Sequence, residues 1–274
     1  MRLVTFRDSP HSTRVGILEN EQVHGLAAET MIEWLNGEGR VRTGTIHPLQ
    51  DVHLLAPVPT PPSFRDFFAY EEHVAKGFEL RGAEIPEAWF EQPIFYFSNP
   101  ASIRGPGDEI ARPADCKLLD FELEIAAVMG PDNEIAGFTL LNDWSARDLQ
   151  IKEMTVGLGP AKGKDFATSL GPMLVTPEEL PYEDGRLHLE ATVTVNGSEV
   201  TRSDASKQHH TWPQIVEHAA RDTHLRPGDV IGSGTLGKGC LLELGPLEGD
   251  RWLEPGDLVA LDAPGLGTLA NPIA

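Results

Sequence analysis

The sequence has few of the features that define several large classes of protein. Only two of its 274 residues are cysteine, Cys116 and Cys240, which excludes a disulfide framework and fits a reducing cytoplasm. No stretch is apolar enough to cross a bilayer, and the first residues, MRLVTFRDSP, lack the apolar region of a signal peptide. We therefore expect a cytoplasmic protein with no membrane partner.

Basic residues are also scarce. The 22 Lys and Arg residues against 42 Asp and Glu residues give a formal net charge of -20. Such a chain repels polyanions, so neither nucleic acid nor an anionic membrane is expected as a partner. It also repels anionic substrates at long range, so a carboxylate substrate would need local capture by a metal ion or by Arg and Lys side chains.

The chain is long enough to bury a large core, in one domain with a small appendage or in two domains. Residues 1–60 contain three short strand patterns, LVTF, RVGIL and QVHGL, and a short helical pattern, ETMIEWLNG. The proline-rich segment 57–62, PVPTPP, interrupts regular structure and is typical of a stiff linker. We expect a small N-terminal α/β domain over residues 1–60 and a second domain over residues 61–274.

Turn and strand signals dominate the second part. Pro-Gly-Asp occurs at 106–108, 227–229 and 255–257, each time before strand-like residues, and suits a type II turn with glycine at positive φ. Asn196-Gly197 predicts a hairpin. Helical patterns cover 70–81 and TWPQIVEHAARDTH but do not alternate regularly with strands. This favours a mainly β (α+β) fold over a doubly wound sheet or a TIM barrel.

The strongest chemical signal lies in residues 118–150. In LLDFELEIAAVMG, acidic residues alternate with apolar ones, which is the period of a strand, so Glu122 and Glu124 would share one face. Their separation along that strand is about 7 Å. A long apolar run follows, so the strand is expected to be central, where a hard divalent cation would offset the repulsion between the carboxylates. A solvated strand face is the alternative. Asp143 ends the next apolar run and adds a third carboxylate.

Other residues leave two interpretations open. Asp66 precedes the helical pattern 70–81 and could cap that helix or bind a metal ion. His73 lies one turn inside it, where a single histidine is more often a surface or core residue. Cys240 follows a Gly-rich segment, 232–239, that lacks the spacing of a phosphate-binding loop. A thiol next to a turn could be reactive, but we favour a packed thiol.

From residue 64 to about 245 the sequence resembles the fumarylacetoacetate hydrolase family. The segments RDFFAYEEH, LDFELEIA, LLNDWSARDLQ, LGPAKGKDFATSLGP and GSGT…GCLLELG occur in the family order. NDWSARDLQ is far more specific than a single E-x-E. The resemblance implies an enzyme with a mixed β-sandwich roll and a small N-terminal domain, assembled as a homodimer.

The resemblance also implies a role for particular residues. Four carboxylates match the ligands of one divalent cation, expected to be Mg²⁺ with Mn²⁺ or Ca²⁺ as alternatives: Asp66, Glu122, Glu124 and Asp143. Thr168 matches a residue that helps to hold a second, structural cation. His73 matches the general base and Glu243 the carboxylate that orients it. Groups around the substrate are matched by Arg147, Gln150 and Lys164, and further substrate contacts by Tyr96, Thr235 and Phe68.

Two positions depart from the fumarylacetoacetase pattern. Phe68 and, across a one-residue insertion, Met154 stand where that pattern has tyrosines, so the pocket wall lacks two hydroxyl groups. A site that loses a hydrogen-bond donor discriminates less, which counts against fumarylacetoacetate itself as the substrate. Lys76 stands where the shorter acylpyruvase and oxaloacetate decarboxylase members have a glutamate, which favours the hydrolase branch.

Three functions are compatible with these residues. The leading hypothesis is metal-dependent hydrolysis of a carbon–carbon bond in a small β-diketo acid, as in aromatic catabolism, with water activated by His73. The second is decarboxylation, isomerisation or tautomerisation of a 2-oxo acid such as oxaloacetate or a hydroxymuconate-type diene, which needs no attacking water. The third is a non-enzymatic cation-binding protein. The basic side chains of Arg147 and Lys164 count against it, since a pure cation site has no use for them.

Overall fold

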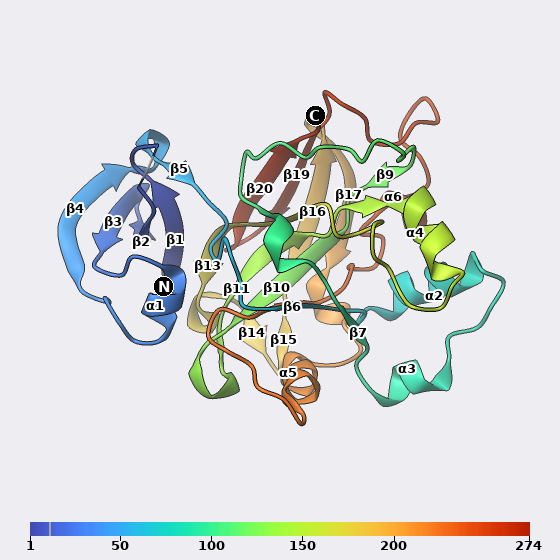
Figure 1. Cartoon of the computed structure of the whole chain (residues 1–274), viewed down its shortest axis with the longest axis horizontal. Helices are drawn as coiled ribbons and strands as arrows, with labels where there is room; N and C mark the ends of the chain where they lie inside the picture. The colour runs from blue at the N-terminus through green and yellow to red at the C-terminus, as the bar shows by residue number, and fades with distance from the viewer. Residues whose placement is uncertain (11) are drawn as a thin grey trace.

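The computed structural model describes residues 1–10 and 12–274, and its central feature is one large mixed sheet (Figure 1). Ten strands follow the order β4-β3-β2-β1-β13-β11-β10-β18-β6-β7, with β5 paired to β1 and β8 to β13. Their bounds are β1 (Arg2–Arg7), β2 (Arg14–Glu19), β3 (Gln22–Leu26), β4 (Arg42–Pro48), β5 (His53–Leu54), β6 (Phe64–Phe67), β7 (Phe95–Phe97), β8 (Ile103–Arg104), β10 (Leu123–Met129), β11 (Ile135–Asn142), β13 (Thr168–Val175) and β18 (Val230–Gly232). The mainly β fold expected from the sequence is confirmed.

A second sheet of four antiparallel strands, in the order β17-β16-β19-β20, packs against the large one. The remaining strands form two short pairs, and the helices are short. The bounds are β16 (Glu190–Val195), β17 (Ser198–Asp204), β19 (Leu258–Ala263), β20 (Gly267–Pro272), β9 (Leu119–Asp120) with β12 (Ser145–Ala146), β14 (Tyr182–Glu183) with β15 (Arg186–Leu187), α1 (Met31–Leu35), α2 (Glu71–Glu79), α3 (Glu87–Glu91), α4 (Arg147–Met154), α5 (Trp212–Ala220) and α6 (Leu241–Leu244). No helix in the described residues is long and apolar enough to span a membrane.

Strand β10 lies at the centre of this arrangement and is buried along its whole length. Its side chains alternate between two cores, because successive residues of a strand point to opposite faces. Leu123 and Ile125 share a core with Val193 and Leu261 of the four-stranded sheet. Ala126 lies in the other core, so Glu124, two residues before it, faces away from the four-stranded sheet. The expected central position of this strand is confirmed.

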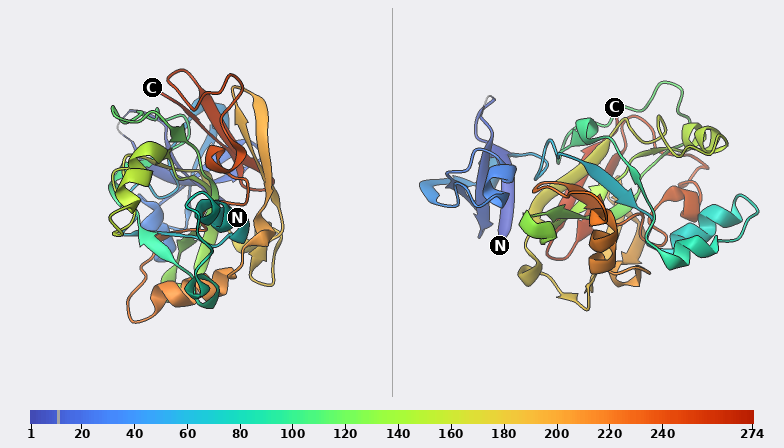
Figure 2. Two further views of the ribbon diagram at one scale, coloured as in Figure 1. Left: turned by 90° about the vertical axis from the view of Figure 1, so that its right-hand side faces the viewer. Right: turned by 60° about the horizontal axis from the view of Figure 1, so that its bottom comes forward.

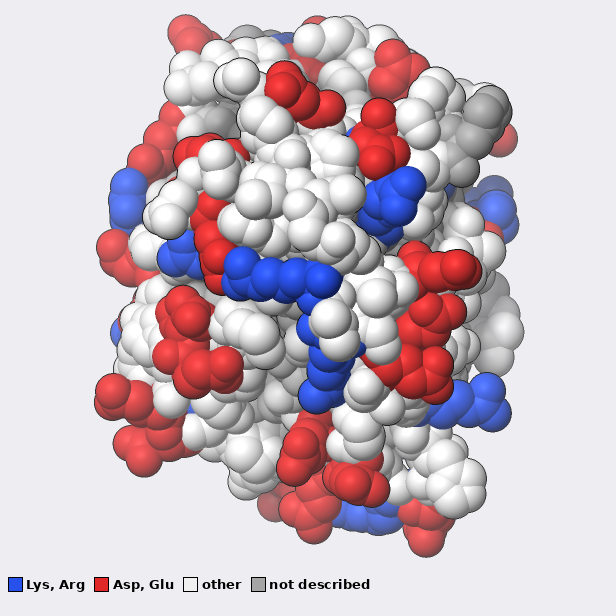
Figure 3. Space-filling view, turned by 90° about the vertical axis from the view of Figure 1, so that its left-hand side faces the viewer, with Lys and Arg blue, Asp and Glu red and all other residues white. Residues whose placement is uncertain are grey.

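The N-terminal strands extend the large sheet. Strand β1 pairs antiparallel with β13, with Leu3 opposite Leu174, and the N-terminal strands stand at one end of the molecule (Figure 2). The sequence did not indicate this shared sheet, and a boundary at residues 60 and 61 stays a prediction. Figure 3 shows acidic side chains spread over this end, with basic ones between them, so a polyanion approaching it meets negative charge.

The turn predictions hold in most places. Gly107, Gly228 and Gly256 all have positive φ, at 80°, 89° and 98°. The hairpin at 196–197 joins β16 to β17. One detail of the sequence interpretation is wrong, because the segment after residue 108 forms only a single bridge instead of a strand. Helix α4 was not predicted, since RDLQIKEM has no apolar stripe.

Candidate active site

Acidic side chains gather on one face of the large sheet, across five neighbouring strands, β13-β11-β10-β18-β6. Glu124 lies in β10, Asp66 lies in β6, and Asp143 directly follows β11. Carboxylate oxygens of these three residues lie within 4.8 Å of one another, and all three side chains are buried. Thr168, the first residue of β13, lies beside them, with its Oγ1 3.5 Å from Asp143 Oδ1. The sheet thus brings together residues that are far apart in the sequence.

The position of Asp66 corrects one alternative from the sequence. Asp66 lies within strand β6, and the cap residue of α2 is Tyr70, whose side chain makes no capping hydrogen bond. A role for Asp66 as a helix cap is therefore wrong. The parallel pairing of β6 with β18, which sets Asp66 opposite Gly232, carries its carboxylate into the acidic cluster instead.

Gly232 allows this cluster to form, and sequence reasoning gave it no role. A Cβ atom at this position would lie 2.2 Å from Asp66 Oδ1 and 3.2 Å from Glu124 Oε2. The two carboxylates therefore meet across β18 only because the strand between them has no side chain there. The available signal was a glycine inside a strand pattern, which often marks a close approach of other groups.

Asp66 and Glu124 lack a direct ion-pair partner among the described residues. Burial raises the pKa of Asp66 and the charge of Asp143 raises it further, while burial and then Asp66 raise the pKa of Glu124. Neither makes an ion pair with Lys or Arg within residues 1–10 and 12–274, and Asp66 Oδ1 is buried without a hydrogen-bond partner there. Oxygen ligands that need positive charge suit a hard divalent cation, so these residues fit the expected metal ion.

The expectation that one strand carries both Glu122 and Glu124 is wrong, because the strand is interrupted and Glu122 lies between β9 and β10. Glu122 also has a different electrostatic environment. Lys164 Nζ lies 2.5 Å from Glu122 Oε2 and 2.6 Å from Asp143 Oδ2, and Arg147 Nη2 lies 2.7 Å from Glu122 Oε1. Burial raises the pKa of Glu122, but Arg147 and Lys164 outweigh it and hold the pKa below its ordinary value. Glu122 is not within the three-carboxylate group, and its expected role as a ligand stays a prediction.

His73 and Glu243 meet beside this cluster although they are 170 residues apart. His73 Nδ1, on α2, lies 2.8 Å from Glu243 Oε2, on α6. The other ring nitrogen, Nε2, lies 3.9 Å from Glu122 Oε1, and Lys164 connects Glu122 to Asp143 of the acidic cluster. Nε2 therefore faces the edge of that cluster. The second oxygen of Glu243 accepts a hydrogen bond from the backbone N–H of Lys238 at 2.9 Å. The edge of the Phe68 ring packs against His73 at a centroid distance of 5.4 Å.

Asp120 connects the two halves of the site, and sequence reasoning assigned it no role. Its Oδ1 accepts a hydrogen bond from Leu241 N at 2.8 Å and its Oδ2 one from Leu242 N at 3.1 Å, at the start of α6. Its Oδ2 also accepts from Arg147 Nε at 2.8 Å. One buried carboxylate therefore holds both the helix that carries Glu243 and the guanidinium that contacts Glu122. The available signal in the sequence was the alternation of acidic and apolar residues in LLDFELEIA, in which Asp120 falls on the same side as Glu122 and Glu124.

Two of the expected substrate contacts form hydrogen bonds with carboxylates of the cluster, and their role toward a substrate stays a prediction. Tyr96 donates a hydrogen bond to Asp143 Oδ2 at 2.7 Å, and Thr235 donates one to Glu124 Oε1 at 3.4 Å. Gln150 lies on α4 and accepts from Arg147 Nη1 at 3.0 Å. The interpretation of Cys240 as a packed thiol is confirmed, since the residue is fully buried.

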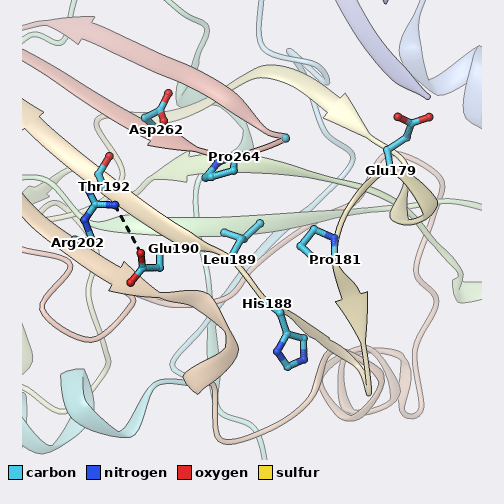
Figure 4. A pocket seen from close by; sticks show the side chains of 10 residues that line it. Glu179, Pro181, His188, Leu189, Glu190, Thr192, Arg202, Asp262 and Pro264 are labelled. Carbon is cyan, nitrogen blue, oxygen red and sulfur yellow. Dashed lines mark ion pairs between the residues drawn. The ribbon is translucent and has the colours of Figure 1, made fainter.

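A surface hollow of about 580 Å³ lies on different elements, over the four-stranded sheet (Figure 4). Its ion pair joins Arg202 Nη1 to Glu190 Oε2 at 3.7 Å, and these side chains are 50% and 63% exposed. A solvated strand face has this character. The buried, charged cluster on the large sheet is therefore the better candidate for an active site.

Comparison with known families identifies the class of protein. The family described as fumarylacetoacetate (FAA) hydrolase, C-terminal, matches residues 63–274, and a family described as Rv2993c-like, N-terminal, matches residues 1–57. The chain belongs to the fumarylacetoacetate hydrolase family, as its motifs indicated.

Individual relatives agree with this assignment. The chain is 32% identical to the fumarylacetoacetase of Oryza sativa subsp. japonica, over 79% of this chain and 66% of that protein, so it spans slightly less than two thirds of the rice enzyme. It is 33% identical to protein Rv2993c of Mycobacterium tuberculosis, over 84% of this chain and 82% of that protein.

Solved structures show the same fold. A structure named as 5-carboxymethyl-2-hydroxymuconate delta-isomerase from Mycobacterium smegmatis superimposes with a TM-score of 0.75 at 30% identity, covering 100% of this chain and 99% of that one. A fumarylacetoacetate hydrolase from Exiguobacterium antarcticum superimposes with a TM-score of 0.78 at 25% identity, over 100% and 99% of the two chains.

Proposed function

We propose that the protein is a metal-dependent hydrolase that cleaves a carbon–carbon bond in a small anionic β-diketo acid of the acylpyruvate class. The observation that carries this proposal is the position of the His73–Glu243 pair beside the acidic cluster. A cation site alone has no need of a base, and a histidine held by a carboxylate is the usual arrangement of a base that activates water.

The cation would be held by Asp66, Glu124 and Asp143, with Glu122 as the fourth proposed ligand. Mg²⁺ is expected, and Mn²⁺ or Ca²⁺ are alternatives, because every ligand is a hard oxygen. When bound, the cation supplies Lewis-acid polarisation of the substrate's carbonyl groups and charge for the enolate that leaves. Thr168 would assist by fixing the carboxylate of Asp143.

His73 would remove the proton from the attacking water through Nε2. Since Nδ1 is hydrogen-bonded to Glu243, the neutral ring carries its proton on Nδ1 and leaves Nε2 free to accept. The ring faces Glu122 with Nε2, so the proton would be taken at the edge of the cation site. Glu243 orients the ring and transfers no proton itself.

Arg147 and Lys164 would stabilise the oxyanion that forms when hydroxide adds to the carbonyl carbon. Both side chains are buried and charged, and both contact Glu122, so they border the same space as His73 Nε2. Gln150 holds Arg147 through its Oε1. Because Phe68 offers no hydroxyl beside His73, we propose an acylpyruvate-like acid as substrate in preference to fumarylacetoacetate itself.

A second candidate is isomerisation, tautomerisation or decarboxylation of a 2-oxo acid on the same site. The similarity to the Mycobacterium smegmatis structure named as a hydroxymuconate isomerase favours it. Such a reaction needs no attacking water, so the His73–Glu243 pair would be dispensable or used differently. Either reaction suits aromatic catabolism.

We also propose that the protein is a homodimer. Light scattering during gel filtration tests this, and the mass of a monomer would contradict it.

The two reactions are separated by the variants His73→Ala and Glu243→Gln, assayed with Mg²⁺ on an acylpyruvate, on oxaloacetate and on a hydroxymuconate-type diene. Removal of a general base typically lowers the rate by ~10²–10⁴, so His73→Ala should lose this much turnover on acylpyruvate and keep its Mg²⁺ affinity. Glu243→Gln should lose less. His218→Ala, which changes a histidine on α5, is the control and should keep wild-type turnover.

Two results would refute the hydrolase proposal. One is wild-type hydrolysis of acylpyruvate by both dyad variants, which would show that the pair is not the base. The other is a wild-type enzyme that turns over oxaloacetate or the diene much faster than any acylpyruvate, in which case the second candidate replaces the first.

A further inference from the structure

Cys240 joins the His73–Glu243 pair to form a cluster with three different donor atoms. Its Sγ lies 3.2 Å from Glu243 Oε2 and 3.8 Å from His73 Nδ1. The two dyad atoms are 2.8 Å apart, and all three lie within 4.8 Å of one another. The thiol is fully buried, and the proposed reaction gives it no task.

We propose that Cys240, His73 and Glu243 form a binding site for Zn²⁺, distinct from the all-oxygen site on the sheet, and that zinc bound there inhibits the enzyme. The binding is independent of the proposed reaction. The inhibition rests on the proposed function, because it requires His73 to act as the base.

The spacing of the three donor atoms suits a zinc ion. Tetrahedral zinc has bonds of roughly 2.3 Å to sulfur and 2.0–2.2 Å to nitrogen and oxygen, which separates its ligand atoms by about 3.3–3.6 Å. The sulfur–oxygen distance of 3.2 Å and the sulfur–nitrogen distance of 3.8 Å are close to this range. Only the nitrogen–oxygen pair, at 2.8 Å, must open by about half an ångström. The thiol proton would leave to solvent, and the proton on Nδ1 would be replaced by one taken from water on Nε2, so the zinc-bound imidazole stays neutral.

The environment supports entry of an ion and retention of the ligands. Glu243 keeps its second oxygen on Lys238 N, so only Oε2 changes partner on binding. The Lys238 side chain is 63% exposed, so the segment whose backbone holds Glu243 borders the solvent from which an ion would enter. Sulfur and imidazole nitrogen select zinc, whereas Mg²⁺ requires oxygen ligands, so the two ions would sort between the two sites.

Zinc on Nδ1 would disable the base, because the neutral ring would then carry its proton on Nε2, the nitrogen that has to accept the proton of water. Mg²⁺ should not relieve the inhibition, because the two ions occupy different ligands. Loss of a partner around a zinc site commonly lowers affinity by about 10–100-fold, so loss of the sulfur ligand in Cys240→Ser should raise the inhibitory zinc concentration by at least about 10-fold. Each variant is compared with its own zinc-free rate.

The direct test uses Co²⁺ as a spectroscopic substitute for zinc, with the protein saturated with Mg²⁺. Wild type should show a thiolate-to-cobalt absorption band in the near ultraviolet, and Cys240→Ser and Cys240→Ala should lose it. Cys116→Ser, which changes the other buried cysteine, is the matched control and should keep both the band and the inhibition. Circular dichroism establishes that each variant is folded.

Each outcome decides a separate point. Absence of the band in wild type, or its persistence in both Cys240 variants, would overturn the site. Equal inhibition of wild type and Cys240→Ser would place the inhibitory zinc elsewhere and overturn the proposal. A band that depends on Cys240 without any inhibition would leave the zinc site standing, overturn its inhibitory role and count against His73 as the base.

Discussion

Replacing Gly232 with alanine should separate the two carboxylates that lack a cation partner. The new Cβ would lie 2.2 Å from Asp66 Oδ1, a distance that real Cβ atoms do not adopt, so the Asp66 side chain or strand β18 must move. Glu124 cannot follow freely, because Gly234 N donates to its Oε2 at 3.0 Å. The variant should therefore fold and bind Mg²⁺ poorly.

The size of the effect follows from binding linkage. At a Mg²⁺ concentration 100 times the dissociation constant, the ion stabilises the folded protein by about 2.7 kcal/mol, and a 100-fold weaker site leaves about 0.4 kcal/mol. The difference of about 2.3 kcal/mol corresponds to roughly 5–9 °C in melting temperature for a chain of this size class. Gly232→Ala should thus lose most of the Mg²⁺-induced rise in melting temperature.

The assay is thermal unfolding of both proteins with Mg²⁺ and with a chelator. Gly77→Ala is the matched control, because a Cβ there meets only Arg81 Nη2, at 3.7 Å. Alanine within a helix is favoured over glycine by about 0.5–1 kcal/mol, so this control should melt slightly higher with an unchanged Mg²⁺ effect. A full Mg²⁺-induced shift in Gly232→Ala would refute the assignment of Asp66 and Glu124 as ligands.

Two further predictions concern the groups around this cluster. Asp120→Asn should lower turnover by about 10²-fold by displacing Arg147 and α6, with the Mg²⁺-induced melting shift unchanged; wild-type turnover would show that Asp120 has no positioning role. In the metal-free protein, Asp66 and Glu124 have folded pKa values above the ordinary 3.8 and 4.5, so the folded state binds more protons. Its stability should fall as pH rises above about 4.5. The lowered pKa of Glu122 affects stability only below this pH range. The measurement is urea unfolding with a chelator present, and a stability that rises from pH 5 to about 7 would contradict the prediction.

The sequence predicted the elements of the fold better than their pairing. Alternation and turn residues are local signals, and they correctly indicated β10 and the 196–197 hairpin. The pairing of β1 with β13 joins Leu3 to Leu174, and nothing local in either strand specifies that partner. A proline-rich segment at 57–62 suggests a boundary even where one sheet runs through both parts.

The candidate site was likewise predicted residue by residue, but not in its three-dimensional contacts. The E-x-E alternation correctly placed Glu124 in a buried strand, but Glu122 lies in the gap between β9 and β10. The family resemblance supplied the other candidates. The resemblance could not show that Glu122 is neutralised while Glu124 is not, because that depends on where Lys164 and Arg147 lie in three dimensions. Gly232 was missed for a related reason, since the value of an absent side chain depends on which groups approach it.

The distribution of charge explains how a chain with a net charge of -20 could hold an anionic substrate. Lys164 is bound by Glu122 and Asp143, and Arg147 is shared between Glu122 and Asp120. Five buried carboxylates thus face one lysine and one arginine, which leaves an excess of negative charge that a divalent cation would reduce: those of Asp66, Asp120, Glu122, Glu124 and Asp143. Without that ion the carboxylates would repel a carboxylate substrate and would keep Lys164 and Arg147 engaged in ion pairs. We therefore expect a bound cation to make Lys164 and Arg147 available to the substrate as well as to polarise its carbonyl groups.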